Sequence, residues 1–207
     1  MNRKLIPGIL AMAVIVMASN ILVQYPLGQW LTWGALTYPF SFLVTDLTNR
    51  LQGAAAARRV VIAGFVVGVL CSLIGTQIMG EFGPLVTLRV ALGSGVAFLV
   101  AQLTDVSVFN RLRQGSWWRA PFVSTIASST LDTLIFFTVA FSAALIFIEP
   151  GNDVSWAGGQ LPLLGSGPMV PLWVSLAIGD WLVKLAMAIV ALVPFRVIVG
   201  KMMARVA

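Results

Sequence analysis

The sequence predicts an all-α integral membrane protein that crosses the bilayer six times. Three observations predict this class: 59% of the 207 residues are hydrophobic, only 10% are charged, and the apolar residues gather in long runs. An average soluble domain has roughly 25% charged residues. A soluble chain of this size could not cover so much apolar surface with its few polar residues. Lipid is the solvent that suits this composition.

Six apolar runs approach the roughly 20 helical residues that a bilayer core requires. We expect the first run to be a retained span, because it is longer than a signal-peptide core and no small-residue cleavage site follows it. The second run, Trp30–Val44, is the shortest and reaches full length only if Asp46 lies at the lipid–water boundary. A single transmembrane domain over residues 1–207 is expected, with spans at 5–23, 30–46, 60–78, 84–108, 120–148 and 169–199.

The positions of Lys and Arg predict the orientation, because cytoplasmic loops carry an excess of these residues. They fall before the first span, in alternate loops and at the end of the last span: Arg3, Lys4, Arg50, Arg58, Arg59, Arg111, Arg113, Arg119, Arg196, Lys201 and Arg205. The other loops contain none. Both termini are therefore expected in the cytoplasm. This placement also accounts for the net charge of +6, so the charge does not imply a nucleic-acid partner.

The longest connection, residues 149–168, is rich in Gly and Pro and is expected on the outer side. Such a segment is typical of a disordered surface loop, and a lid over an outer entrance is the alternative. The third span instead carries a stripe of small residues: Gly64, Gly68, Ser72 and Gly75. This stripe predicts close helix packing, either as a scaffold within the chain or as the contact of a homodimer.

Polar side chains inside the expected spans are the candidate site residues, because an ionised group at mid-bilayer costs roughly 2.5–3.5 kcal/mol on insertion scales. Asp132 has Thr125, Ser128 and Ser129 at positions seven, four and three residues before it, which places all four on one helical face. That face is expected to line the bundle interior, where Asp132 either contacts a ligand or proton or makes a structural hydrogen bond.

Asp180 and Lys184 are four residues apart near the middle of the last span. Opposite charges one turn apart partly neutralise each other, so a purely structural ion pair is one interpretation. The other is that the pair lines the same cavity as Asp132.

Six further residues complete the candidate substrate-binding set: Asn20, Asp46, Arg89, Gln102, Asp105 and Phe136. Arg89 is expected to extend to the outer surface, to pair with an interior Asp or to gate the outer mouth. Asp46 and Asp105 either join the site or pair with basic residues of the inner loops. Asn20 and Gln102 offer amide groups for hydrogen bonds.

The sequence shows no pattern typical of catalysis. It has no His, no metalloprotease or nucleophile-elbow motif and no phosphate-binding glycine pattern, so no catalytic residue, metal or cofactor is expected. Cys71, the single cysteine, is interpreted as a small packing residue. A solute carrier fits best. The alternatives are a binding subunit that needs a separate ATPase, a membrane enzyme, and a structural membrane subunit.

Several segments resemble the bacterial YhhQ-like queuosine precursor transporters, grouped as the vitamin uptake transporter family. The matching segments are "SNILVQYPLG" from Ser19, "LTWGALTYPFSFLVTDLTNRLQGAAAARRVV" from Leu31, "LRVALGSGVAFLVAQLTDVSVFNRLRQ" from Leu88, "WWRAPFVSTIASSTLDTLIFFTVAF" from Trp117 and "GDWLVKL" from Gly179. They cover about half of the chain, in order. The loop at 149–168 and the third span lie outside them.

The resemblance implies import of a 7-deazaguanine, the cyano or aminomethyl precursor of queuosine, across the bacterial inner membrane. It also implies six helices, similar in outline to the substrate-binding subunits of energy-coupling-factor vitamin importers. The sequence does not require an ATPase partner. The interior carboxylates suit both proton coupling and facilitated diffusion.

A binding hypothesis follows from the chemistry of such a base. A desolvated carboxylate accepts two parallel hydrogen bonds from adjacent N–H groups, so Asp132 is expected to contact the base edge. Asp180 and Lys184 are expected to shape or couple the site. Stacking requires flat aromatic neighbours, for which the candidates are Phe40, Phe42, Phe136 and Trp181.

Overall fold

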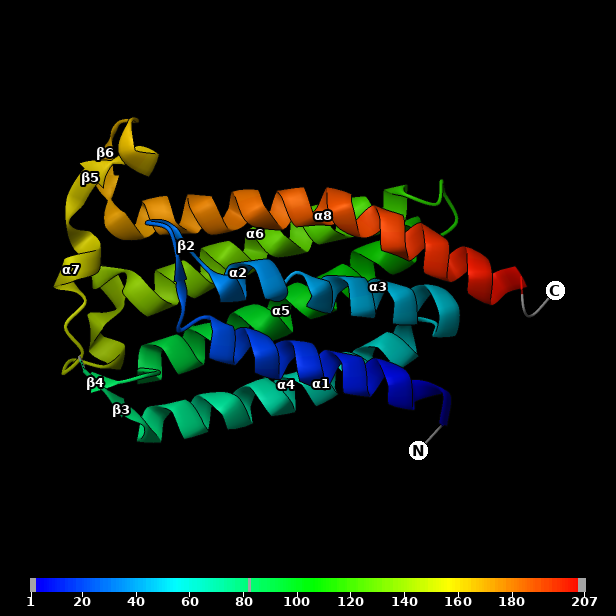
Figure 1. Ribbon diagram of the computed structural model, residues 1–207, viewed down its shortest axis with the longest axis horizontal. Helices are drawn as coiled ribbons and strands as arrows, with labels where there is room; N and C mark the ends of the chain where they lie inside the picture. The colour runs from blue at the N-terminus through cyan, green and yellow to red at the C-terminus, as the bar shows by residue number, and fades with distance from the viewer. Residues whose placement is uncertain (1–2, 82, 205–207) are drawn as a thin grey trace.

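The computed structural model describes residues 3–81 and 83–204 and forms a bundle of roughly parallel and antiparallel helices (Figure 1). Within these residues, five helices are long and apolar enough to cross a membrane. They are α1 (Ile6–Leu22), α4 (Ala54–Gln77), α5 (Leu88–Leu112), α6 (Arg119–Phe141) and α8 (Leu172–Ala204). A 3-10 turn, η1 (Arg3–Leu5), precedes α1. The predicted class, a helical membrane protein, is confirmed.

The expected second span is not one continuous helix. It consists of α2 (Trp33–Thr37) and α3 (Phe40–Gln52), which are separated at Tyr38 and Pro39. Proline has no N–H to donate and its ring clashes with the preceding turn, which explains the break. A hairpin of β1 (Pro26–Leu27) and β2 (Leu31–Thr32) precedes α2, and α3 extends six residues past the expected end at 46.

Asp46 lies in the middle of α3 and is only 3% exposed. Its depth in the bilayer, and with it the expectation that it sits at the lipid–water boundary, stays a prediction. The helix continues for six residues beyond it, to Gln52.

Other helix ends also differ from the expected spans. The helix α4 begins at Ala54, directly after Gly53 ends α3, so Arg58 and Arg59 lie in a helix and not in a loop. Gly53 makes this tight connection with a φ of 89°, which suits glycine. A second hairpin, β3 (Met79–Gly80) with β4 (Gly83–Pro84), occupies the expected start of the fourth span.

The expected fifth and sixth spans are also too long at the ends that flank the 149–168 loop. The helix α6 ends at Phe141 and is followed by η2 (Ala143–Ile148), while α8 begins at Leu172. The loop between them contains α7 (Ser155–Gly158), η3 (Leu163–Gly165) and a hairpin of β5 (Gln160–Pro162) with β6 (Met169–Pro171).

This ordered structure shows that the expectation of a disordered loop is wrong. The loop packs on the helix ends beside it. The Trp156 ring lies 5.6 Å from the Phe141 ring, and the Leu164 N–H donates to Ser175 Oγ of α8 at 3.3 Å.

The small-residue stripe of α4 packs against helices of the same chain. A Cβ on Gly64 would lie 2.5 Å from Met12 Cγ of α1, and one on Gly75 would lie 2.5 Å from Val86 Cγ2. These distances are shorter than a van der Waals contact, so glycine is required for this approach. The interpretation of α4 as scaffold is confirmed at these two positions, while a homodimer contact stays a prediction.

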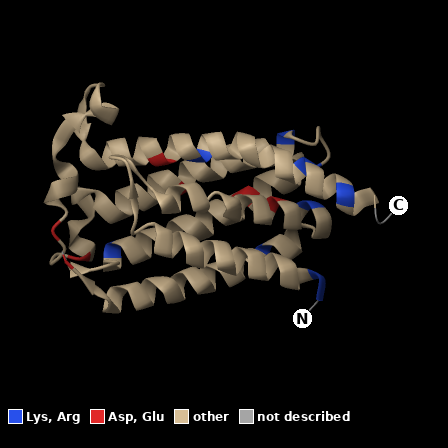
Figure 2. Ribbon diagram, viewed as in Figure 1, with Lys and Arg blue, Asp and Glu red and all other residues tan. Residues whose placement is uncertain are grey.

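Charged residues are segregated along the bundle (Figure 2). Most Lys and Arg lie at the end that holds both termini, and several acidic residues lie at the opposite end (Figure 2). Arg205 falls outside the described residues. Between the two ends, a few charged groups lie at mid-bundle and mark the candidate site.

Candidate functional site

A cavity of about 530 Å³ opens among α1, α2, α4, α5, α6 and α8. The β1–β2 hairpin, which contributes Pro26, Gln29 and Trp30, forms part of its wall. Its volume lies within the roughly 300–1,000 Å³ typical of small-molecule sites. No residue of the 149–168 loop lines it, so the hairpin, rather than the suspected lid, borders this cavity.

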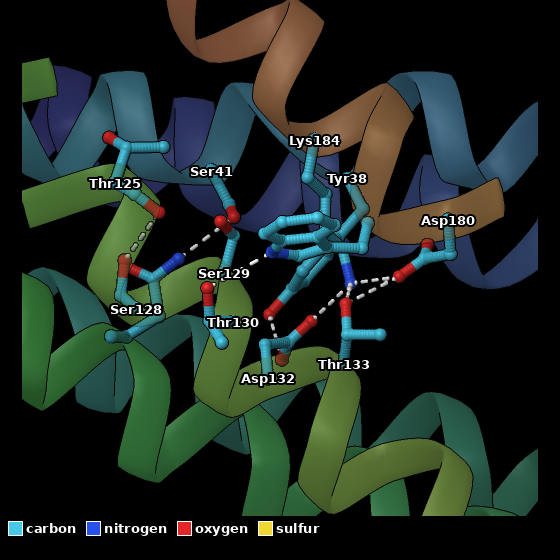
Figure 3. A network of polar contacts seen from close by, with 12 residues as sticks. Tyr38, Ser41, Thr125, Ser128, Ser129, Thr130, Asp132, Thr133, Asp180 and Lys184 are labelled. Carbon is cyan, nitrogen blue, oxygen red and sulfur yellow. Dashed lines mark hydrogen bonds and ion pairs between the residues drawn. The ribbon is translucent and has the colours of Figure 1, made fainter. Parts of the chain in front are cut away.

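Three charged side chains converge on the wall of this cavity, and we call them the charged triad: Asp132, Asp180 and Lys184 (Figure 3). Lys184 Nζ lies 2.6 Å from Asp132 Oδ2 and 2.5 Å from Asp180 Oδ2. The four-residue spacing places Asp180 and Lys184 on one face of α8, and the hydroxyl-rich face of α6 presents Asp132 to them. The prediction that both helices contribute to one interior cavity is confirmed.

Hydroxyl groups hold the charged triad in place. Tyr38 OH, at the break between α2 and α3, donates to Asp132 Oδ1 at 3.0 Å. Thr133 Oγ1 donates to Asp180 Oδ2 at 2.8 Å, and Lys184 Nζ donates to Thr133 Oγ1 at 3.1 Å (Figure 3). The Lys184 ammonium also lies 5.5 Å from the centre of the Tyr38 ring. Both oxygens of Asp132 are thus occupied.

Asp180 has the freer carboxylate. Among the hydrogen bonds of the described residues, none reaches its Oδ1, and its side chain is 15% exposed against 7% for Asp132. With two carboxylates and one ammonium, the charged triad carries a net charge of −1 when all three groups are ionised. It therefore offers a hydrogen-bond acceptor to a ligand in the cavity.

Two of the other predicted site residues also line the cavity, namely Asn20 and Phe136. Asn20 Nδ2 donates to Val16 O at 2.9 Å within α1. Of the other proposed stacking residues, Phe40, Phe42 and Trp181 do not line the cavity, and Trp181 Nε1 instead donates to Thr130 Oγ1.

Arg89 does not line the cavity, although it is fully buried. Its Nε and Nη2 donate to the carbonyl oxygens of Val139 and Ser142, at 3.0 and 2.6 Å. These carbonyls belong to the C-terminal end of α6, where a cation satisfies unpaired acceptors and the helix dipole. Its backbone N–H donates to Glu149 Oε2 at 3.0 Å. The structure thus gives Arg89 a capping contact, and the expected pairing with an interior Asp is wrong.

Gln102, Asp46 and Asp105 lie apart from the cavity in a second buried group. Gln102 Nε2 donates to Ser41 Oγ at 2.8 Å, and Thr45 Oγ1 donates to Gln102 Oε1 at 2.6 Å. The two ion pairs of the described residues both belong to Lys184. The expected pairing of Asp46 and Asp105 with inner basic residues is therefore wrong.

Several aromatic residues of the cavity were not predicted from the sequence: Trp30, Tyr38, Phe65, Phe98, Phe137 and Phe141. Tyr38 is the most informative, because its hydroxyl contacts Asp132. The signal for it was its position before Pro39, where a helix is expected to break.

The family model with the description "Putative vitamin uptake transporter" matches residues 32–199. The chain belongs to this vitamin uptake transporter family. The match covers α2 to α8 and includes the charged triad and the second buried group.

Curated relatives agree with this assignment. The chain is 35% identical to the "Queuosine precursor transporter" of Escherichia coli (strain K12), over 94% of this chain and 86% of the relative. It is 35% identical to the "Probable queuosine precursor transporter" of Haemophilus influenzae, over 87% and 79%. A relative of the same description from Bacillus subtilis is 30% identical, over 84% and 74%. No solved structure matches the chain.

Proposed function

We propose that this membrane protein imports a 7-deazaguanine precursor of queuosine, in its 7-cyano or 7-aminomethyl form, across the bacterial cytoplasmic membrane. The observation that carries the proposal is the charged triad on the wall of a 530 Å³ cavity among apolar helices. Relatives that carry the name queuosine precursor transporter, similar over most of their length, supply the substrate class.

The charged triad suits the hydrogen-bonding edge of such a base. A 7-deazaguanine has adjacent N–H donors on one edge, and carboxylates are the strongest acceptors of a parallel pair of hydrogen bonds. Asp180 Oδ1 is free to accept the first N–H, and Asp132 Oδ1 accepts the second when the Tyr38 hydroxyl turns away. Phe136 and the aromatic residues beside it provide flat surfaces for stacking.

The proposed topology has six crossings in one domain over residues 1–207, with α2 and α3 together as the second crossing. Both termini and the basic helix ends then lie in the cytoplasm, and the cavity opens toward the outer side. This outline is similar to that of substrate-binding subunits of energy-coupling-factor importers. A helix broken beside a substrate site is common in secondary transporters, and Tyr38 lies at such a break.

We also propose that the chain acts as a transporter without an ATPase partner and without converting its substrate. Purified protein in liposomes tests both points, because labelled substrate must exchange across the membrane and be recovered unchanged. Exchange that appears only with added cytoplasmic ATPases, or recovery of a different compound, would contradict the proposal.

The test in cells is rescue of a strain that lacks its own queuosine precursor synthesis and transport. At limiting external precursor, the intact chain is expected to restore queuosine in tRNA. The Asp180→Asn variant is expected to fail to restore queuosine. The matched control is Asp153→Asn, at an exposed position in the loop of residues 149–168, and it is expected to restore queuosine. No rescue by the intact, membrane-inserted protein would overturn the proposal.

A further inference from the structure

The second buried group contains two carboxyls that the proposed substrate site does not use. These two carboxyls and the polar residues around them, without Gln102, are called the inner cluster: Asp46 and Asn49 of α3, Asp105 of α5, and Ser124, Thr125 and Ser128 of α6. All six are buried, and Asp105 is 0% exposed. Ser124 and Thr125 hydroxyls donate to the two oxygens of Asp46, at 3.4 and 3.5 Å, and Ser128 donates to Asp105 Oδ1 at 3.3 Å.

The inner cluster has too few hydrogens for its acceptors. Asp46 and Asp105 accept from Ser124 and Ser128, which lie one turn apart on α6, so the two buried carboxyls face the same stretch of that helix. Asp105 Oδ2 has no donor among the described residues. The same holds for Asn49 Oδ1, whose amide Nδ2 donates to Val106 O, the carbonyl next to Asp105. Two buried acceptors at one α3–α5 interface therefore lack a hydrogen-bond donor among the described residues.

In the part of the chain that the structure describes, no ion pair reaches Asp46 or Asp105. The ion pairs within residues 3–81 and 83–204 both involve Lys184, and Arg50, on the last turn of α3, donates to the Arg113 carbonyl. From α6 the pair meets only hydroxyls. The α8 residues that line a cavity of about 10 Å³ together with Asp46 and Thr125 are all uncharged: Met187, Ala188, Ala191 and Phe195.

Polar side chains lie between the inner cluster and the charged triad. Ser128 lies one turn before Asp132 on α6, and Gln102 lies one turn before Asp105 on α5. Gln102 also bonds to Ser41 and Thr45 of α3. The helix α3 begins after the break at Tyr38 and Pro39, so a shift of α3 would move Asp46 and the Tyr38–Asp132 contact together.

We propose that the inner cluster is a proton-binding site and that its proton couples to movement of the substrate. This inference rests on the proposed function. With the proton bound, an O–H of one carboxyl donates to the other carboxylate and holds α3 against α5. When the proton leaves to the cytoplasm, two like charges face each other in a buried site, and their repulsion favours separation of α3 from α5 and opening toward the cytoplasm. One proton enters and leaves with each substrate.

Liposomes that contain the purified protein test the coupling in the wild type. The probe is labelled 7-cyano-7-deazaguanine, with the membrane potential held at zero by potassium and valinomycin. A pH difference of one unit, alkaline inside, is a tenfold difference in proton activity, so one-to-one coupling predicts accumulation of about tenfold. A protonophore is expected to abolish it. Accumulation that follows a sodium gradient, or none under any gradient while exchange proceeds, would overturn the proton site.

The variants Asp46→Asn and Asp105→Asn test whether the inner cluster is the site at which the proton is coupled to transport of the base. Asparagine mimics a carboxyl that stays protonated, so opening toward the cytoplasm no longer depends on proton release. Each variant is expected to exchange the base more slowly than the wild type and to lose accumulation above the external concentration. Asp153→Asn, on the exposed loop, is the control and is expected to accumulate normally. Full accumulation by both inner variants would overturn the assignment.

A third measurement remains informative if these variants do not transport. The infrared C=O stretch of a protonated carboxyl is expected in the wild type at neutral pH and should be lost in Asp105→Asn. A band that is absent from the wild type, or unchanged in the variant, would overturn the proposal. Failure of the wild type to exchange the base, with the band present, would instead contradict the proposed substrate and leave the proton site supported.

Discussion

The charged triad and the inner cluster contain the same number of carboxyls in the same bundle, but they differ in charge balance and in access. The charged triad has Lys184 between Asp132 and Asp180 and lines a cavity of about 530 Å³. The inner cluster makes no ion pair among the described residues, and Asp46 and Thr125 line a cavity of about 10 Å³. The difference shows that the partners of a buried Asp, rather than its burial alone, decide its chemistry.

The contrast has an energetic basis. Burial of an ion costs several kcal/mol unless a partner of opposite charge and hydrogen bonds offset the cost. Lys184 provides that offset for two carboxylates, so both can stay ionised and accept hydrogen bonds from a ligand. Asp46 and Asp105 have only hydroxyl donors and each other. A proton is the simplest group that removes their excess charge.

The largest expected effect comes from removing the cation of the charged triad. Lys184→Met leaves Asp132 and Asp180 facing each other without a counterion, and breaking a buried ion pair on one side costs about 3–5 kcal/mol. The midpoint of thermal unfolding in detergent is expected to fall by roughly 10 °C, and uptake is expected to be lost.

A second variant checks the cause. Adding Asp180→Asn to Lys184→Met removes the like-charge repulsion and is expected to restore part of the lost stability. An unchanged midpoint in Lys184→Met would show that the lysine does not stabilise the two carboxylates.

The next effect is on transport through the charged triad. Asp132→Asn replaces one acceptor oxygen by an amide donor, which repels an N–H of the base and faces the Lys184 ammonium. Uptake of labelled 7-deazaguanine is expected to fall to background while the protein is still inserted in the membrane. Asp153→Asn is the control, and normal uptake by Asp132→Asn would remove Asp132 from the binding site.

An Asp→Asn substitution in the inner cluster is expected to have the opposite effect on the midpoint of thermal unfolding. In Asp105→Asn the new amide can donate to Asp46, which replaces the shared proton and satisfies an acceptor. The unfolding midpoint is expected to stay equal or rise by a few degrees, corresponding to about 1 kcal/mol. Asp132→Asn is expected to lower the unfolding midpoint, because it removes a carboxylate from Lys184. Measuring both variants in one detergent compares the regions directly, and a large loss of stability in Asp105→Asn would show that its charge is satisfied.

The sequence predicts those features of the site that depend on spacing along one helix. The hydroxyls before Asp132 and the four-residue step from Asp180 to Lys184 define faces, and both faces lie inside the bundle. Helical periodicity suffices for this because side chains three and four residues apart share a side. The apolar runs likewise predict the long helices, to within a few residues at most ends.

Spacing does not predict which faces meet across helices. Asp46 and Asp105 were candidates for the substrate site, but the axial positions of α3 and α5 place them with Ser124 and Ser128, away from Lys184. The contacts of Arg89 could not be predicted from spacing either, because they depend on where the C-terminal end of α6 lies. Tyr38 reaches Asp132 across 94 positions of sequence, and only the break at Pro39 indicated a special backbone there.

The smallest expected effect concerns Tyr38, the residue between the two regions. Tyr38→Phe keeps the ring beside Lys184 but removes the 3.0 Å hydrogen bond to Asp132 Oδ1. A hydrogen bond to a charged group contributes about 1.5–3 kcal/mol, and a base that takes the vacated position recovers part of this. The apparent affinity for the base is therefore expected to change by less than about tenfold, because tenfold corresponds to 1.4 kcal/mol. If the regions communicate through Tyr38, the variant should also accumulate less base under a pH gradient at unchanged exchange, measured in liposomes beside Tyr25→Phe as the control. Unchanged accumulation would show that the inner cluster acts on the charged triad by another route.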